Sequence, residues 1–360
     1  MNESTKAKIK VLVVDDSPVA QELLIHILSS DPGIEIIGTA SNGEDAIKET
    51  KHLSPDVITM DIHMPKMDGY EATRRIMETC PVPIVIVTGS TGAQEVSMAM
   101  RVIEAGALAF VQKPRGIGHP DYQDDVSRFI QTVKLMSEVK VVRRRAFPRR
   151  ETNQTVEVKL ERQPEIQLVA IGASTGGPPV LQTILSKLPG NFPVPVLIVQ
   201  HMAAGFIQGF MEWLGQTSSL PVHVATHGEF ILPGHVYLAP DGFAMKPDRY
   251  GRISLARGEI ENGLCPSVSY LFRSVAEVFG KNAVGILLTG MGKDGAEELK
   301  LMKEKGAITI AQDKESSVVH GMPGEAINLD AAMYVLSPEK IAAVLSGLVN
   351  NKLEMRVVNL

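Results

Sequence analysis

Short aliphatic runs alternate with longer amphipathic stretches along the first third of the chain. The amphipathic stretches carry apolar residues at helical spacing, whereas the aliphatic runs are short and bounded by polar or turn residues. This alternation is typical of a parallel α/β sheet with helices as crossovers. We therefore predict five buried parallel strands, within residues 9–16, 34–40, 55–61, 83–89 and 107–114.

The first and last helices of this region have clear boundaries. Ser17 has the chemistry of an N-cap, Pro18 suits the first helical position, and the turn residues 31–33 end the first helix. Its expected buried stripe consists of Val19, Leu23, Leu24, Ile27 and Leu28. The last helix is expected over about 121–142.

The composition changes after that helix. Residues 143–165 are polar and lack helical or strand periodicity, and five arginines fall within 143–150. A basic run can bind an anionic partner, but a solvated linker is the more common use of such a composition. We predict a linker at 141–165, which separates a first domain at 9–140 from a second domain.

Alternation of strands and helices resumes at residue 166 and continues to about 353. Apolar runs around 166–173, 194–200, 283–289 and 307–312 predict a second, doubly wound and mostly parallel α/β domain over 166–353. Between them, residues 223–258 contain short β-like runs and turn residues without a helical pattern. This stretch predicts a small antiparallel excursion.

Composition narrows the function classes. The 360-residue chain has a net charge of −5, which argues against a nucleic-acid partner. No apolar run approaches the roughly 18 residues that span a bilayer, so we expect no membrane insertion. With two cysteines, Cys80 and Cys265, neither a disulfide framework nor a zinc ribbon is indicated, and we expect a cytoplasmic protein.

Polar residues end four of the five strands predicted in the first domain. Asp15 and Asp16 follow the first strand, Asp61 the third, Thr88 ends the fourth and Lys113 follows the fifth. The carboxyl ends of parallel strands meet at one edge of the sheet, where three carboxylates would repel one another without a hard cation such as Mg²⁺. Asp61 can then act as a nucleophile toward phosphate, with Lys113 and Thr88 as partners of the phosphoryl oxygens.

Residues 9–139 resemble the receiver domain of two-component response regulators. The resemblance rests on VVDDS, MDIHMPKMDG, the VTG turn and QKP. It implies a flavodoxin-like fold, a histidine kinase as phosphodonor, and Asp61 as phosphoacceptor. It also implies Mg²⁺ held by Asp15, Asp16 and Asp61, and a switch formed by Thr88, Phe110 and Lys113.

The first strand of the second domain leads into a glycine-rich turn. Gly172-Ala-Ser174-Thr-Gly176-Gly177 is a G-x-S-x-G sequence between a strand and a helix, the context that exposes a serine nucleophile on a sharp turn. Glycines permit the strained backbone and leave N–H groups accessible to an oxyanion. The same residues also occur in ordinary turns, so this motif needs partners.

Two further strand ends supply such partners. The next strand ends at His201, and the strand 283–289 leads to Asp294. Serine, imidazole and carboxylate at one rim of a sheet are the components of a catalytic triad. Their chain order, Ser, His, Asp, differs from that of the α/β-hydrolases, which places the same chemistry on another topology.

Gly290-x-Gly292-x-x-Gly295, with Asp313 at the end of the next strand, also matches a dinucleotide-binding pattern. Only 47 residues follow Asp313, too few for the remaining units of such a domain. We therefore favour the triad interpretation.

The region 166–353 resembles the catalytic domain of the chemotaxis protein-glutamate methylesterases, the CheB family. The matching pieces are GASTGG, VQHM, LAP, PSVSYLFRS, LTGMGKDG and HGMPGEA. The resemblance implies a hydrolase-type domain in which Ser174, His201 and Asp294 form the triad, the backbone N–H of Met291 stabilises the oxyanion and Thr175 supports the imidazole. Its substrates would be methylated glutamates, and also glutamines, of chemoreceptors, and the unphosphorylated receiver would cover the catalytic rim.

Two positions depart from the family pattern. Ala244 stands where the family often has histidine, and Cys265 where it usually has arginine. We expect both near the rim, together with His320, whose role the sequence leaves open. A response regulator whose second domain only binds a partner is the alternative to an enzyme, and methanol release distinguishes the two.

Overall fold

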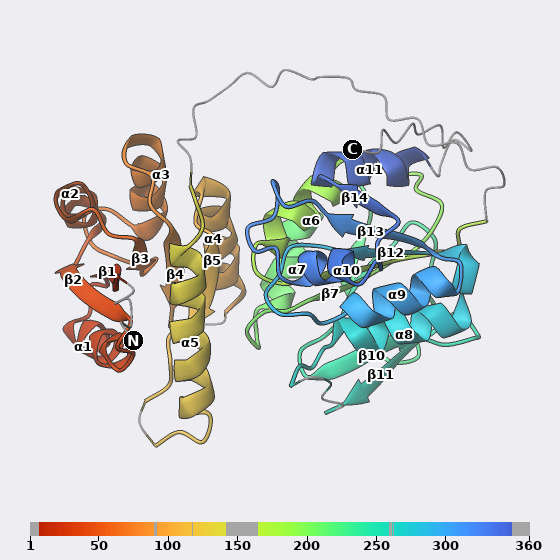
Figure 1. Cartoon of the computed structure of the whole chain (residues 1–360), viewed down its shortest axis with the longest axis horizontal. Helices are drawn as coiled ribbons and strands as arrows, with labels where there is room; N and C mark the ends of the chain where they lie inside the picture. The colour runs from red at the N-terminus through yellow and green to blue at the C-terminus, as the bar shows by residue number, and fades with distance from the viewer. Residues whose placement is uncertain are drawn as a thin grey trace, which may run out of the picture. The chain divides into compact units, whose positions relative to one another are not determined.

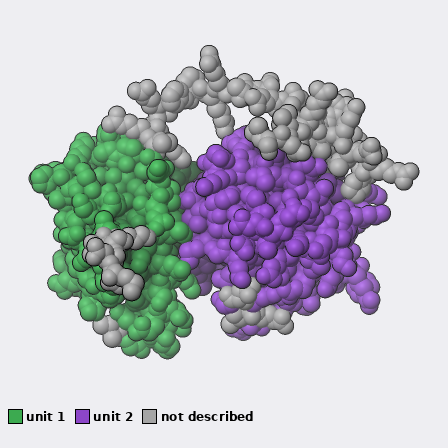
Figure 2. Space-filling model, in the orientation of Figure 1, with its two compact units in different colours: residues 1–149 green, residues 150–360 purple. Residues whose placement is uncertain are grey.

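The structure, a computed structural model, describes residues 7–89, 92–116, 118–141, 165–258, 261 and 263–347. Backbone contacts divide the chain into two units, residues 1–149 and 150–360 (Figure 2). Of the linker predicted at 141–165, residues 142–164 lie outside the described part of the chain, so its boundaries stay a prediction.

The first unit is a parallel sheet of five strands in the order β2-β1-β3-β4-β5, with helices on both faces (Figure 1). The strands are β1 (Ile9–Val14), β2 (Ile34–Ala40), β3 (Val57–Met60), β4 (Ile84–Thr88) and β5 (Ala109–Gln112). The helices are α1 (Pro18–Ser29), α2 (Gly43–Leu53), α3 (Gly69–Thr79), α4 (Ala93–Ala105) and α5 (Tyr122–Ser137). This is the parallel α/β sheet expected from the strand pattern, in the flavodoxin-like order that the resemblance to receiver domains implies.

The boundaries of α1 follow the predicted signals, since Ser17 accepts a hydrogen bond from the amide of Ala20 at 3.4 Å. The expected apolar stripe was wrong at Val19, which is 76% exposed because it lies on the solvent side of the first turn. The last helix, α5, ends at Ser137 rather than near 142. Its buried stripe ends at Met136, so packing no longer supports the helix beyond that turn.

The second unit contains a seven-stranded sheet, all parallel, in the order β14-β13-β12-β6-β7-β9-β8. Its strands are β6 (Leu168–Ala173), β7 (Val196–Gln200), β8 (Val222–Val224), β9 (Val236–Leu238), β12 (Ala283–Leu287), β13 (Ile308–Gln312) and β14 (Tyr334–Leu336). Its helices are α6 (Gly177–Leu185), α7 (Ile207–Gly215), α8 (Val268–Val278), η1 (Gly280–Asn282), α9 (Ala296–Glu304), α10 (Met322–Asn328) and α11 (Pro338–Gly347).

The antiparallel excursion is smaller than the turn-rich pattern of 223–258 suggested. Among the strands in the described part of the chain, only β10 (Phe243–Pro247) and β11 (Ile253–Arg257) pair in antiparallel fashion, and an isolated antiparallel bridge joins Phe230 to Arg252. Within the same stretch β9 pairs with β7, and β8 pairs with β9, both in parallel as an extension of the main sheet. Strands of three residues are too short to show a periodicity in the sequence.

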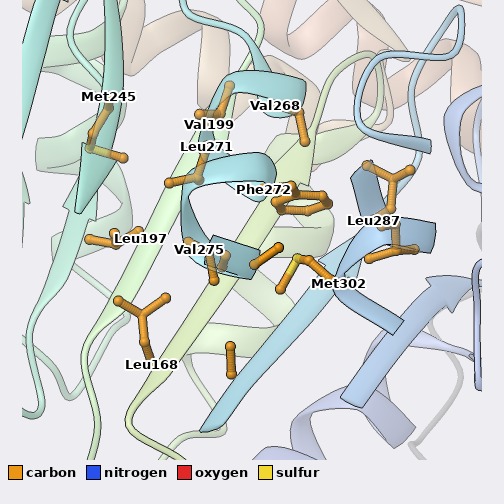
Figure 3. Packing of buried hydrophobic residues seen from close by; sticks show 14 of the residues in the cluster. Leu168, Leu197, Val199, Met245, Val268, Leu271, Phe272, Val275, Leu287 and Met302 are labelled. Atoms are coloured by element: carbon orange, nitrogen blue, oxygen red, sulfur yellow. The ribbon is translucent and has the colours of Figure 1, made fainter. Parts of the chain in front are cut away.

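A continuous apolar core joins the central strands of the second unit to the helices α8, α9 and α10. Figure 3 shows one part of it, in which Leu271, Phe272 and Val275 of α8 pack above Leu168 and Leu197 of the sheet. Because β6 lies between β7 and β12, the turns that follow these three strands open at one edge of the sheet. The serine, histidine and aspartate predicted from the sequence all belong to these turns.

Candidate functional site

Three carboxylates meet at the edge of the receiver sheet. Asp15 and Asp16 follow β1, Asp61 follows β3, and single oxygens of the three lie within 4.8 Å of one another. Asp15 and Asp61 are buried and Asp16 is exposed. Lys113 Nζ lies 2.7 Å from Asp15 Oδ2 and 3.2 Å from Asp61 Oδ1, so the ammonium offsets part of the negative charge.

Burial and neighbouring charges shift the protonation of this cluster. Burial, and then the nearby Asp15 carboxylate, raise the pKa of Asp61 despite the opposing effect of Lys113. Burial alone would lower the pKa of Lys113, but its contacts with Asp15 and Asp61 outweigh burial and raise it. The site therefore holds excess negative charge that a cation can relieve.

The predicted switch residues lie beside this cluster. Thr88 Oγ1 donates a hydrogen bond to Glu95 Oε1 at 2.7 Å, and Glu95 Oε2 lies 2.6 Å from His63 Nε2. Phe110 is partly buried on β5 and packs against the receiver core. Glu95 and His63 were missed by the sequence argument, because nothing in their spacing indicates that Glu95 of α4 contacts both Thr88 and the turn after β3.

In the second unit, Ser174 follows the central strand β6. Its amide donates to Thr289 O at 3.0 Å, and Gly177 N donates to Ser174 O at 2.8 Å, so the serine backbone is held from both sides. Gly176 has φ of 78°, a conformation that favours glycine. The predicted sharp turn between strand and helix is present at 174–177, and Ser174 is partly exposed there.

His201 and Asp294 are brought into contact from the ends of β7 and β12, the two strands on either side of β6. His201 Nε2 lies 3.0 Å from Asp294 Oδ2, with side-chain exposures of 12% and 3%. The contact of Ser174 Oγ with the imidazole stays a prediction. Since Nε2 is the nitrogen near the carboxylate, Nδ1 would be the ring nitrogen available to the serine.

The carboxylate of Asp294 is also held by the start of α8. Ser267 Oγ donates to Oδ1 at 3.0 Å, Ser269 N to Oδ1 at 3.1 Å, and Val268 N to Oδ2 at 2.7 Å. Burial would raise the pKa of Asp294, but the hydrogen bonds and the imidazole outweigh it and lower the pKa to about 2. The carboxylate is thus ionised and fixed in orientation.

Ser267 and Ser269 were missed as site residues, although both belong to the PSVSY stretch. Their signal was indirect, since Ser267 has the sequence of an N-cap and caps α8 through the amide of Tyr270. An N-cap serine normally serves its own helix, so its bond to Asp294, 27 positions away, had no sequence signature.

The loop that carries Met291 lies against the turn that carries Ser174. A Cβ on Gly290 would lie 2.7 Å from Ser174 Cβ, so only glycine permits this approach. Met291 is the next residue, which puts its amide close to the serine. Thr289 Oγ1 donates to Thr175 O at 2.9 Å and ties the same loop to the turn.

The remaining positions have mixed outcomes. His320 forms a bridge with Gly290, so it lies beside this loop as expected. Ala244 is fully buried in β10 and so presents no side chain to a partner, while its expected place near the rim stays a prediction. Asp313, the aspartate of the dinucleotide pattern, accepts hydrogen bonds from Ser316 within its own turn.

Comparisons with known proteins find relatives of both units. The profile of CheB methylesterases matches residues 169–345, and that of the response regulator receiver domain matches residues 11–119. A protein-glutamate methylesterase/protein-glutamine glutaminase of Nitrosospira multiformis is 58% identical over 97% of this chain and 99% of its own length. Protein-glutamate methylesterase/protein-glutamine glutaminase 1 of Syntrophus aciditrophicus is 57% identical over 94% of this chain and 97% of its own. The crystal structure of the Thermotoga maritima CheB methylesterase catalytic domain covers 51% of this chain and 98% of that chain at 39% identity, with a TM-score of 0.49.

A receiver sheet followed by a second α/β unit with a paired histidine and aspartate defines a response regulator whose output unit is an enzyme. The matches to the curated relatives span both units and nearly the whole chain. The chain belongs to the CheB methylesterase family, in the form that carries an N-terminal receiver domain. Among the described residues, no helix combines the length and apolarity needed to cross a membrane.

Proposed function

We propose that this chain is a phosphorylation-activated hydrolase that removes methyl esters from glutamate side chains of chemoreceptors and deamidates receptor glutamines. One observation carries the proposal: His201 Nε2 lies 3.0 Å from the buried Asp294, next to the strand end that presents Ser174. The descriptions of the relatives, which name both reactions, support it.

The proposed reaction is that of a Ser-His-Asp triad. Ser174 Oγ attacks the carbonyl carbon of the ester while His201 accepts its proton at Nδ1, and Asp294 stabilises the imidazolium. The protonated imidazole then gives that proton to the leaving methoxide, which departs as methanol. Water, activated by the same imidazole, hydrolyses the acyl-enzyme to glutamate and regenerates Ser174. A glutamine side chain would release ammonia instead.

The backbone N–H of Met291 is proposed to stabilise the oxyanion of each tetrahedral intermediate. The close approach of Gly290 to Ser174 supports this role, because Met291 is the next residue along the chain. Thr175 is proposed to support the imidazole from the residue next to the nucleophile.

The receiver is proposed to accept a phosphoryl group on Asp61 from a chemosensory histidine kinase. Three carboxylates within 4.8 Å suit Mg²⁺, which prefers oxygen ligands, so Asp15, Asp16 and Asp61 would hold it. The cation would supply positive charge that the phosphodonor needs in order to approach this acidic cluster. Thr88, Phe110 and Lys113 are proposed to respond to the phosphoryl group.

The remaining expectations complete the proposal. The substrates are methylated chemoreceptors, reached from the cytoplasm without insertion of this chain into the membrane and without nucleic acid. The unphosphorylated receiver restrains the catalytic unit, and phosphorylation of Asp61 releases it.

Release of methanol from membranes with methylated receptors tests the proposal. The intact chain should release methanol, and acetyl phosphate with Mg²⁺ should accelerate the release. Ser174→Ala should abolish the release while Asp61 is still phosphorylated, because the two sites belong to different units. More than a trace of activity in Ser174→Ala would contradict the assignment of the nucleophile, and no release from the wild type would contradict the function.

A further inference from the structure

Gln200, the last residue of β7, directs its carboxamide toward the backbone of the proposed nucleophile and base. Gln200 Nε2 donates to Ser174 O at 2.9 Å and to His201 O at 2.8 Å. Both partners are carbonyl oxygens, which only accept, so the nitrogen must be the atom that faces them. The two N–H groups of one amide thus connect two residues from neighbouring strand ends.

The surroundings of Gln200 limit its movement. Gln200 is 3% exposed, and its backbone pairs in register with Ala173, the residue before the nucleophile. A Cβ on Gly177 would lie 2.1 Å from Gln200 Oε1, so the last glycine of the GASTGG turn leaves the space that the carboxamide occupies. The side chain therefore has one narrow position, which the adjacent turn keeps open.

Ser174 O accepts a second hydrogen bond, from Gly177 N at the start of α6, at 2.8 Å. His201 N in turn donates to Ala173 O at 2.9 Å. Without the carboxamide, His201 O would lose this donor and the two turns would remain joined only by the backbone pairing of β6 and β7. A buried carbonyl without a donor is costly, so these turns would shift to find another partner.

We propose that Gln200 is a positioning residue for catalysis, which sets the relative placement of Ser174 and His201 by donating to the carbonyl oxygens of both. The inference rests on the proposed function for the roles of these two residues. It assigns to Gln200 no contact with the substrate. Its loss should therefore reduce the reactivity of the serine and leave substrate binding nearly unchanged.

Two near-isosteric variants test this role in the intact chain. Gln200→Met retains length and removes both donors, whereas Gln200→Glu replaces the donating nitrogen with an oxygen that repels both carbonyls. When the introduced carboxyl is protonated it regains one donor. The ratio of Gln200→Glu activity to wild-type activity at the same pH should therefore rise as the pH falls. The same ratio for Gln200→Met should not change with pH.

The measurements are kcat and KM for methanol release and the rate at which a fluorophosphonate labels Ser174. A misplacement of about 1 Å between reacting groups can cost on the order of 100-fold, so we expect Gln200→Met to lower kcat and labelling by at least about tenfold. KM should stay within about twofold of wild type, since a group that acts on the reaction step alone changes kcat. The labelling requires only an activated serine, so it tests Gln200 whether or not methylated glutamate is the substrate.

Thr309→Val provides the matched control. Thr309 is fully buried on β13, and its hydroxyl donates to Ala331 O at 2.7 Å, away from the proposed triad. Its loss removes a buried hydrogen bond from the same unit and should leave kcat and labelling near wild type. Fluorescence of Trp213, the only tryptophan, reports in each variant whether the second unit is folded.

Three results would overturn the proposal. The first is labelling of Gln200→Met at the wild-type rate. The second is a loss of activity no greater than that of Thr309→Val at equal folded fraction. The third is a Gln200→Glu ratio that does not rise as the pH falls, which separates a donor role from packing even if Gln200→Met folds poorly. A wild type that labels normally but releases no methanol would contradict the proposed substrate and not the role of Gln200.

Discussion

At the residue scale, Asp294 is the most buried of the three proposed triad residues, and its carboxylate accepts three hydrogen bonds from the start of α8. Its folded pKa of about 2 lies below the ordinary value of 3.8. A depressed carboxyl pKa stabilises the folded state above the unfolded pKa, and this contribution is lost as the pH falls through the folded value. The shift corresponds to roughly 2 kcal/mol for a group this buried.

Asp294→Asn should show this loss directly. We expect the free energy of unfolding of wild type to exceed that of the variant by a constant amount above about pH 4, with the difference shrinking by roughly 2 kcal/mol toward pH 2. Urea unfolding followed by the fluorescence of Trp213 restricts the measurement to the second unit. A difference that is independent of pH between 2 and 5 would show that the carboxylate is not stabilised by its partners.

Asp16 carries a second prediction at this scale. It is the exposed member of the three proposed Mg²⁺ ligands, so its substitution leaves the buried part of the receiver intact. Loss of a residue that only hydrogen-bonds to a metal ligand typically lowers metal affinity about 10- to 100-fold. Asp16 is proposed as a direct ligand, so Asp16→Asn should weaken Mg²⁺ binding by about tenfold or more. Labelling of Asp61 by acetyl phosphate at limiting Mg²⁺ measures the effect, and excess EDTA should abolish it.

Asp56→Asn is the matched control for Asp16→Asn. Asp56 is also an exposed aspartate of the receiver, but its carboxylate accepts a hydrogen bond from the amide of Lys10 at 2.8 Å and is no member of the three-carboxylate cluster. Equal Mg²⁺ dependence in Asp16→Asn and wild type would remove Asp16 from the metal site.

At the element scale, α4 holds the proposed switch hydroxyl through Glu95, which accepts a hydrogen bond from Thr88 at 2.7 Å. If phosphorylation draws Thr88 toward Asp61, as proposed, this bond must break first. A hydrogen bond to a charged acceptor contributes about 1.5–3 kcal/mol, so Glu95→Ala should lower the acetyl phosphate concentration for half-maximal activation roughly tenfold. Methanol release against acetyl phosphate concentration gives the measurement.

Glu95→Gln keeps an acceptor for Thr88 while removing the charge that faces His63. The acetyl phosphate concentration for its half-maximal activation should therefore lie between those of wild type and Glu95→Ala. An unchanged or higher requirement for acetyl phosphate in Glu95→Ala would mean that α4 does not restrain the switch.

The elements also show how far the sequence could predict the site. Strand ends were readable, because apolar runs stop at Asp15, Asp61, Ser174 and His201, and parallel strands bring such residues to one edge. Contacts that other helices and strands make with these residues could not be predicted from the sequence. The start of α8 reaches Asp294 from 27 positions away, and β8 and β9 are too short to show their parallel pairing.

At the scale of the whole molecule, the proposed phosphorylation site and the proposed active site belong to different units, so control would have to be transmitted between them. Phosphorylation of Asp61 would add about −1.5 to −2 charge there and would form new contacts for Thr88 and Lys113. Moving a restrained state from dominant to rare requires about 5 kcal/mol of differential stabilisation, and a smaller shift gives partial activation. A phosphoryl group with this charge in a partly buried site can shift the ratio of active to restrained molecules several-fold or more.

We therefore predict that a fragment beginning near Pro164 has higher basal esterase activity than the intact unphosphorylated chain. Asp61→Asn in the intact chain should keep the basal rate and lose activation by acetyl phosphate, because the receiver remains in its restraining state. The comparison requires equal folded fractions, which Trp213 fluorescence reports for both proteins. A fragment no faster than the intact chain would contradict restraint by the receiver. Phosphorylation would then have to act by increasing the activity of the catalytic unit or by bringing it to its receptors, and activation that persists on a soluble ester substrate would select the former.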